Sequence, residues 1–180
     1  MTSEATGSAG PIRVLLVDDS KSVRAVLRRF FSWTDDIEVV GEAADGAEAV
    51  RLAVSLEPEV ILMDLLMPGV DGYSAIEEIM RRRPAPILVL SAKATRNQVQ
   101  TAFEAFRRGA VEVLPKPEDT ESWRHLATTL PDVVRGVARH GGRRAAQAGG
   151  AEAAENRAAV HRAAESHAAE ARAAESRAAR

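Results

Sequence analysis

The chain has no cysteine, no long apolar run and little net charge. The lack of cysteine excludes disulfide bonds and thiolate metal sites and is compatible with a cytoplasmic protein. No stretch approaches the roughly 18 apolar residues of a membrane-spanning helix. Residues 1–11 are small and polar, which predicts a flexible leader rather than a signal peptide. The net charge of −2 gives no reason to expect a nucleic-acid partner.

From residue 12 to about residue 140, short apolar runs alternate with helical patterns. Repeated in this way, they predict βα units and a parallel sheet covered by helices on both faces. The runs that predict strands are residues 13–17, 38–43, 60–63, 87–90 and 111–114. The last predicted helix, 120–139, contains Pro131, which predicts a kink or a break at that point.

The composition changes abruptly after His140. Residues 141–151 are rich in glycine and predict a linker, and residues 152–180 are a low-complexity tail of Ala, Glu and Arg. Such a composition favours a solvated helix or disorder. Val160 is the one large apolar residue after Gly141, so we expect no hydrophobic coiled coil in this tail.

Polar residues stand at four of the predicted strand ends. Asp18 and Asp19 follow the first strand, Asp64 the third and Ser91 the fourth, and Lys116 comes shortly after the fifth. Ligands of parallel sheets gather at the carboxyl ends of the strands, so these side chains are expected to share one crevice. Three carboxylates, a hydroxyl and an amine suit a metal ion, with Mg²⁺ favoured by the oxygen ligands, together with a phosphoryl group.

Most of these residues also have a purely structural explanation. Asp18 and Asp19 would also serve as N-cap acids before a helix, and Ser20 is a further N-cap candidate. A hydroxyl at a strand end such as Ser91 is commonplace, and Lys116 between two prolines would be a solvated lysine in a rigid loop.

Asp64 is different, because it ends a run of buried apolar residues. A carboxylate there is costly unless it is paired, hydrogen-bonded or metal-bound, and a carboxylate can act as a nucleophile toward phosphorus. Lysine suits phosphate binding as a point charge, and a cis Lys116–Pro117 bond would aim the amine.

With these motifs in this order, the sequence resembles the receiver domains of two-component response regulators. The matching segments are Val-Asp18-Asp19-Ser, Asp64-Leu-Leu-Met-Pro-Gly-Val-Asp-Gly72, Ser91-Ala92 and Lys116-Pro117. The resemblance implies a doubly wound, flavodoxin-like α/β fold over residues 12–140, with five parallel strands in the order 2-1-3-4-5. The segments Arg82-Arg83-Pro84-Ala85-Pro86 and Arg108-Gly-Ala-Val-Glu112 make it most similar to the receiver half of chemotaxis protein-glutamate methylesterases.

The resemblance also implies roles. Asp64 would take phosphate from a histidine kinase, with Mg²⁺ held by Asp19, Asp64 and the Leu66 backbone carbonyl, and by Asp18 through water. Ser91 and Lys116 would hold the phosphoryl oxygens and move on phosphorylation. The protein would catalyse only its own Mg²⁺-dependent phosphorylation and dephosphorylation, and would signal in a chemotaxis-like pathway through altered partner binding.

Two features depart from the family pattern. Val113 stands where many receivers carry an aromatic switch residue, so a rotating ring cannot report phosphorylation there. No Gly-x-Ser-x-Gly nucleophile elbow follows His140, and we expect no methylesterase domain. The output surface implied by the family is the face of the fourth helix, fifth strand and fifth helix, including Phe103, Phe106 and Val113.

Three alternatives stay open. The chain would be the remnant regulatory half of a chemotaxis methylesterase and act as a phosphate sink, or it would be a tethering or DNA-associated regulator that acts through the tail. A dehalogenase-like phosphatase also uses a strand-end aspartate, but that family has Asp-x-Asp where this chain has Asp18-Asp19-Ser20.

Overall fold

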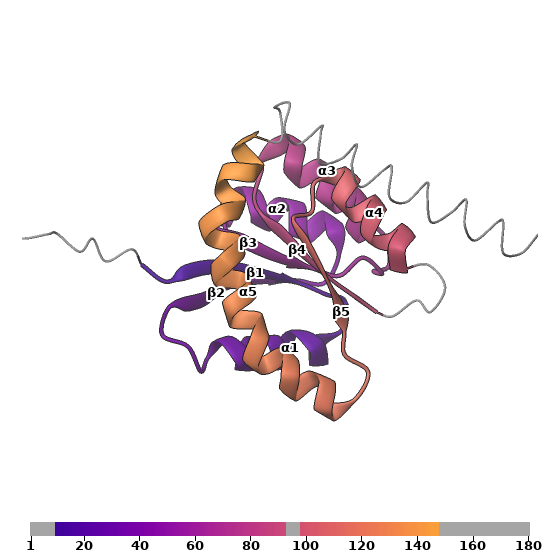
Figure 1. Ribbon diagram of the computed structural model, residues 1–180. Helices are drawn as coiled ribbons and strands as arrows, with labels where there is room; N and C mark the ends of the chain where they lie inside the picture. Colours follow the sequence, from indigo (N-terminus) through magenta and orange to yellow (C-terminus); the bar gives the residue numbers. More distant parts are fainter. Residues whose placement is uncertain (1–9, 93–97, 148–180) are drawn as a thin grey trace, which may run out of the picture.

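A computed structural model describes residues 10–92 and 98–147 of the chain (Figure 1). Its elements alternate between strand and helix throughout. In chain order they are β1 (Ile12–Val17), α1 (Lys21–Phe31), β2 (Ile37–Ala43), α2 (Gly46–Leu56), β3 (Val60–Met63), α3 (Gly72–Arg82), β4 (Ile87–Ala92), α4 (Gln98–Arg108), β5 (Glu112–Lys116) and α5 (Thr120–Gln147). The predicted tail at 152–180 and most of the predicted leader lie outside the described residues.

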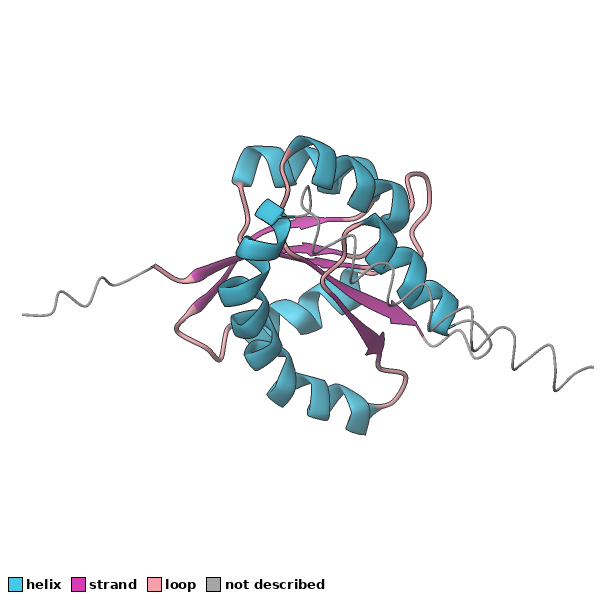
Figure 2. Cartoon of the chain, turned by 45° about the horizontal axis from the view of Figure 1, so that its top comes forward, coloured by secondary structure: helices cyan, strands magenta, loops and turns pink. Residues whose placement is uncertain are grey.

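The strands form one parallel sheet in the order β2-β1-β3-β4-β5, which confirms the predicted topology. Helices α1 and α5 cover one face of the sheet, and α2, α3 and α4 cover the other (Figures 1 and 2). All four residues of β3 are buried, because this central strand has helices over both of its faces. Double coverage is why the central strand β3 is a continuous apolar run rather than an alternating one.

Strands β4 and β5 extend beyond the apolar runs that predicted them. Ser91 pairs with Pro115 and Ala92 with Lys116, so the predicted positions of Ser91 and Lys116 after the strand ends are wrong. Pairing is a property of the backbone, and it continues past the last apolar side chain. Pro115 is tolerated because β5 is an edge strand, where a missing N–H removes no bond to a further neighbour.

Helix α5 is longer and more regular than its composition suggests. It runs without interruption through Pro131 to Gln147, so the predicted break at Pro131 is wrong. Leu130 and Val134 flank the proline and are fully buried, and their packing offsets the lost backbone hydrogen bond. The helix also includes residues 141–142, where the glycines predict a linker. Each of them lowers helix stability by about 1 kcal/mol relative to alanine, without ending the helix.

None of the helices in the described parts of the chain is both long and apolar enough to cross a membrane.

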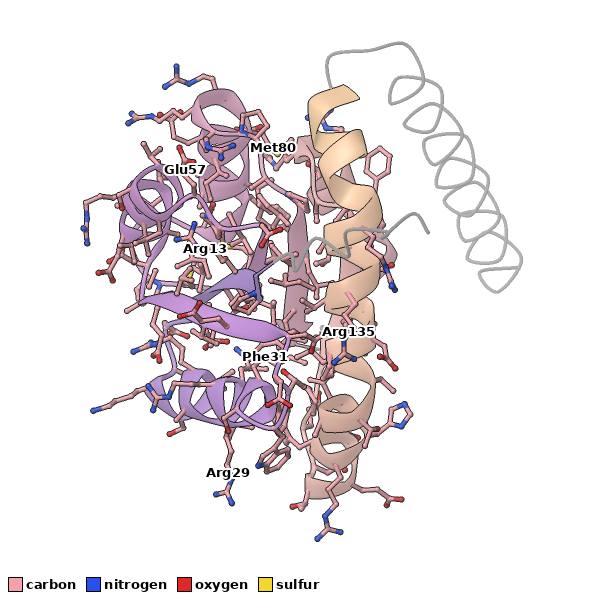
Figure 3. All side chains as sticks on the ribbon, turned by 90° about the vertical axis from the view of Figure 1, so that its left-hand side faces the viewer. Arg13, Arg29, Phe31, Glu57, Met80 and Arg135 are labelled. Atoms are coloured by element: carbon pink, nitrogen blue, oxygen red, sulfur yellow. The ribbon has the colours of Figure 1, made fainter. Side chains whose placement is uncertain are left out.

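An ion pair joins α5 to the residue just before β2. The guanidinium of Arg135, labelled in Figure 3, donates from Nε and Nη2 to the two carboxylate oxygens of Asp36, at 2.7 and 2.8 Å. The hydrogen bonds from Arg135 lower the pKa of Asp36 below its ordinary value of 3.8. A carboxyl with a lowered pKa stabilises the fold above its ordinary pKa, and this contribution disappears as the pH falls through the lowered value.

We therefore expect Asp36→Asn to lower the melting temperature modestly at pH 7, since the pair is exposed. The difference from the wild type should shrink as the pH falls below the ordinary pKa of Asp36 toward the lowered value, and it should also shrink in high salt. Thermal unfolding followed by circular dichroism, from about pH 2.5 to pH 7, measures both effects. A difference that stays constant across this range would contradict the assignment.

Candidate functional site at the carboxyl edge of the sheet

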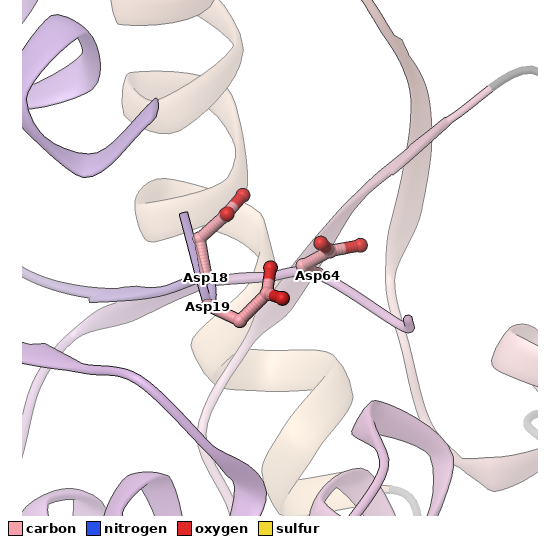
Figure 4. Close-up of side chains that lie close together, drawn as sticks. All are labelled: Asp18, Asp19 and Asp64. Atoms are coloured by element: carbon pink, nitrogen blue, oxygen red, sulfur yellow. The ribbon is translucent and has the colours of Figure 1, made fainter. Parts of the chain in front are cut away.

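Three aspartates meet where β1 and β3 end (Figure 4). Val17 and Met63 are partners in adjacent strands, so the residues that follow them, Asp18 and Asp64, leave the sheet side by side. One carboxylate oxygen from each of Asp18, Asp19 and Asp64 lies within 4.8 Å of the others. Asp18 and Asp64 are buried, whereas Asp19 is exposed and opens the cluster to solvent.

Lys116 bridges the two buried carboxylates. Its Nζ lies 2.7 Å from Oδ2 of Asp18 and 2.8 Å from Oδ2 of Asp64. Burial raises the pKa of Asp18, and the bonds from Lys116 and from the Ser20 N–H offset part of that increase. Burial alone would lower the pKa of Lys116, but its two carboxylate partners outweigh burial and the pKa is raised. The ammonium therefore stays charged and compensates one of the carboxylates.

The cluster fits a hard divalent cation. Its donors are all carboxylate oxygens, and three carboxylates against one ammonium leave two negative charges when all four groups are ionised. Oxygen ligands and surplus negative charge suit Mg²⁺, and the exposed Asp19 leaves room for the waters that this ion retains. Asp18, Asp19 and Asp64 are the residues that would hold it.

The structural explanation for the Asp18–Asp19 pair does not hold, because another residue caps α1. Ser20 is the N-cap, and its hydroxyl accepts a hydrogen bond from the Val23 N–H at 3.4 Å. Asp18 instead accepts from the Ser20 N–H at 2.9 Å, which fixes the carboxylate at the end of β1. Neither Asp18 nor Asp19 is therefore the N-cap of α1.

The loop after β3 also contacts the cluster. The Leu66 N–H donates to Oδ1 of Asp64 at 3.2 Å, so Asp64 is held from both sides, by this amide and by Lys116. The Leu66 side chain is largely exposed beside the site. A ligand role for the Leu66 carbonyl stays a prediction.

Ser91 and the Lys116–Pro117 peptide differ from the expectations. Ser91 is buried on β4, next to β3, but its hydroxyl donates to the Ala92 carbonyl at 3.4 Å, a long bond. The flanking prolines allow a cis Lys116–Pro117 bond, but the described backbone contains no cis peptide. Lys116 is the last residue of β5, and from this position its side chain reaches the acids.

Two residues at the site were given no role by the sequence. Gly72 begins α3 directly against the backbone of Asp64, a role hidden within a segment that predicts only a turn. Arg24 on α1 donates to the backbone carbonyls of Asp18 and Asp19. It is one of three arginines in α1, and the sequence does not distinguish it from the other two.

The residues predicted for an output face, Phe103, Phe106 and Val113, are all half-buried. Val113 packs against the apolar cluster between the sheet and helices α2, α3 and α4. A valine in this place contributes to the core.

The model of the family described as the response regulator receiver domain matches residues 14–128. The chain belongs to this family. Its receiver region is also similar to a solved structure, the response regulator domain of Thermotoga maritima CheB, with a TM-score of 0.66 and 37% identity. That match covers 72% of this chain and 97% of the other. A chain of the CheX-CheY-BeF3-Mg²⁺ complex from Borrelia burgdorferi is similar with a TM-score of 0.55 and 26% identity, covering 67% of this receiver chain and 88% of that one.

Curated relatives of this receiver are methylesterases whose receiver half is the part that matches. Protein-glutamate methylesterase/protein-glutamine glutaminase 3 of Myxococcus xanthus is 49% identical over 112 residues, which are 62% of this chain and 32% of the relative. Protein-glutamate methylesterase/protein-glutamine glutaminase 2 of Carboxydothermus hydrogenoformans is 43% identical over 133 residues. These are 73% of this chain and 37% of the relative. The chain thus spans about a third of the length of these relatives.

Proposed function

We propose that Asp64 accepts a phosphoryl group from a histidine kinase, in a reaction that requires Mg²⁺ at Asp18, Asp19 and Asp64. The observation that supports this most strongly is that the buried Asp64 carboxylate lies among two further acids and one lysine. A carboxylate oxygen of Asp64 forms the new bond to phosphorus, and the bond from phosphorus to the imidazole nitrogen of the donor breaks. When bound, Mg²⁺ would neutralise charge on the phosphoryl oxygens.

The other residues of the site have complementary roles in this proposal. Lys116 keeps its charge and is 15% exposed, so it can exchange a carboxylate oxygen for a phosphoryl oxygen without leaving the crevice. The weak bond of Ser91 to the Ala92 carbonyl leaves its hydroxyl able to turn toward the same group. These two residues would carry the change from the site into β4 and β5.

Substitution of Asp64 by asparagine tests the proposal directly. The wild-type chain, incubated with a small-molecule phosphodonor and Mg²⁺, should gain the mass of one phosphoryl group, and Asp64→Asn should gain none, because the amide is not a nucleophile. Chelation of the metal should also abolish labelling. Intact-protein mass spectrometry measures both.

Asp71→Asn is the matched control. Asp71 is exposed and caps α3, and asparagine caps equally well, so its labelling should equal that of the wild type. Labelling that survives Asp64→Asn would overturn the proposal.

We further propose that this receiver acts in a cytoplasmic chemotaxis-type pathway, supported by the methylesterase relatives. It would be a binding module rather than an enzyme, and its output would pass through the face of α4, β5 and α5.

Because the chain matches only the receiver half of those relatives, a phosphate sink is the second candidate. Phosphoryl transfer from a purified chemotaxis-type kinase tests the pathway. A chain that takes phosphate from small donors, but not from such a kinase, would belong to another pathway.

A further inference from the structure

Arg24 touches the backbone of both acids at the end of β1. Its Nη1 donates to the carbonyl of Asp18 at 2.6 Å and to the carbonyl of Asp19 at 3.3 Å. The Arg24 side chain is 14% exposed, and its bond to the Asp18 carbonyl is partly buried, whereas its bond to the Asp19 carbonyl is exposed to solvent. Arg24 makes these contacts through the carbonyl oxygens, which marks it as a residue that acts on the acids indirectly.

A second contact fixes the direction of this guanidinium. Its Nε donates to Oε2 of Glu42 on β2 at 3.1 Å, and the other oxygen of Glu42 accepts from Arg28 at 2.7 Å. The guanidinium is planar and its donors point in fixed directions, so holding Nε also sets where Nη1 points. Through Arg24 the Asp18–Asp19 segment is tied to β2 as well as to α1.

The segment needs such a restraint because its charges repel. Three carboxylates lie within 4.8 Å of one another, and Lys116 contacts only Asp18 and Asp64. Asp19 is exposed, and its position depends on the backbone that carries it. Two bonds to consecutive carbonyls restrain that backbone at the point where Asp19 leaves it.

We propose that Arg24 is a positioning residue that holds Asp18 and Asp19 in the geometry needed to bind Mg²⁺. This inference rests on the proposed function. Residues that orient metal ligands typically change metal affinity about 10- to 100-fold when they are removed. Because Arg24 acts through the backbone, we expect the lower end of that range.

Calorimetric titration of the full chain with Mg²⁺ tests the proposal. Arg24→Gln should raise the Mg²⁺ dissociation constant about 10-fold. Arg24→Lys should give an intermediate value, because an ammonium can reach the carbonyls but lacks the fixed second donor to Glu42. Glu42→Ala, which frees the guanidinium, should also weaken binding. In each variant, raising the Mg²⁺ concentration should restore the rate of labelling by a phosphodonor.

Arg28→Gln is the control. Arg28 binds the same glutamate, but its side chain is 60% exposed and its contact is with Glu42 rather than with the acidic segment. Its Mg²⁺ affinity should equal that of the wild type, which separates loss of an arginine near Glu42 from loss of the carbonyl contacts.

An unchanged Mg²⁺ affinity in Arg24→Gln would overturn the inference, even if its melting temperature fell. If Arg24→Gln does not unfold cooperatively, the Mg²⁺ affinities of Arg24→Lys and Glu42→Ala test the inference instead. Wild-type Mg²⁺ affinity in both of these variants would also overturn it. A wild-type chain that binds no Mg²⁺ would instead overturn the proposed function and this inference together.

Discussion

Replacing Gly72 by alanine is expected to destabilise the domain by about 3 kcal/mol and to abolish labelling of Asp64. A Cβ on Gly72 would lie 2.2 Å from the carbonyl oxygen of Asp64 and 2.7 Å from the Cα of Leu65. Both are backbone atoms in a buried segment, so no side-chain rotation can relieve the clash. The backbone of Asp64 would have to move, and with it the carboxylate that Lys116 holds at 2.8 Å.

Gly136→Ala is the matched control for this substitution. Gly136 lies within α5, and a Cβ there would meet no atom within 4 Å. Alanine should therefore stabilise the helix by up to about 1 kcal/mol and leave labelling unchanged. Urea unfolding measures the stabilities, and mass spectrometry the labelling, at a temperature where both variants are folded. A Gly72→Ala chain with wild-type stability would contradict the packing described here.

Replacing Lys116 by methionine is expected to cost about 3–5 kcal/mol of folding stability, because it leaves two buried carboxylates without a counter-charge. Methionine retains most of the apolar stem and cannot donate. Asp18 and Asp64 are 2% and 4% exposed, so solvent screens their charges poorly. Phosphoryl labelling should also fall, since the proposed partner for the phosphoryl oxygens is gone.

A second substitution shows whether the loss is electrostatic. Asp18→Asn in the Lys116→Met chain removes one of the two uncompensated charges and should recover part of the lost stability. In the wild-type background Asp18→Asn leaves Lys116 paired with Asp64, so a double-mutant cycle in urea isolates the coupling. Additive losses in the cycle would show that Lys116 and Asp18 do not interact as described.

The sequence predicted the sheet and its acidic edge because both depend on local patterns. Strands covered on two faces must be apolar throughout, and Asp64 at the end of such a run requires a partner. The strand order came from the resemblance and not from periodicity, since hydrophobic patterns do not specify which strands are neighbours. The true ends of β4 and β5 were missed because backbone pairing continues past the last apolar residue.

The contacts around the site depend on three-dimensional neighbours that the sequence does not reveal. The strand ends predict that Lys116 shares a crevice with the acids, but nothing in the sequence indicates that its amine contacts Asp18 and Asp64 together. Arg24 and Arg28 have the same chemistry and neighbour each other on α1, yet only Arg24 reaches the carbonyls. The close approach of Gly72 to Asp64 is likewise a matter of packing between α3 and β3.

The course of α5 has a practical consequence for experiments on this receiver. By Arg135 the helix has already reached the start of β2, at the edge of the sheet opposite the acids, and twelve more residues follow to Gln147. At 1.5 Å per residue, these residues add about 18 Å of helix. A dye or surface linker attached at the exposed Arg139 therefore leaves the crevice clear for a kinase, and immobilised protein should accept phosphate as readily as protein in solution.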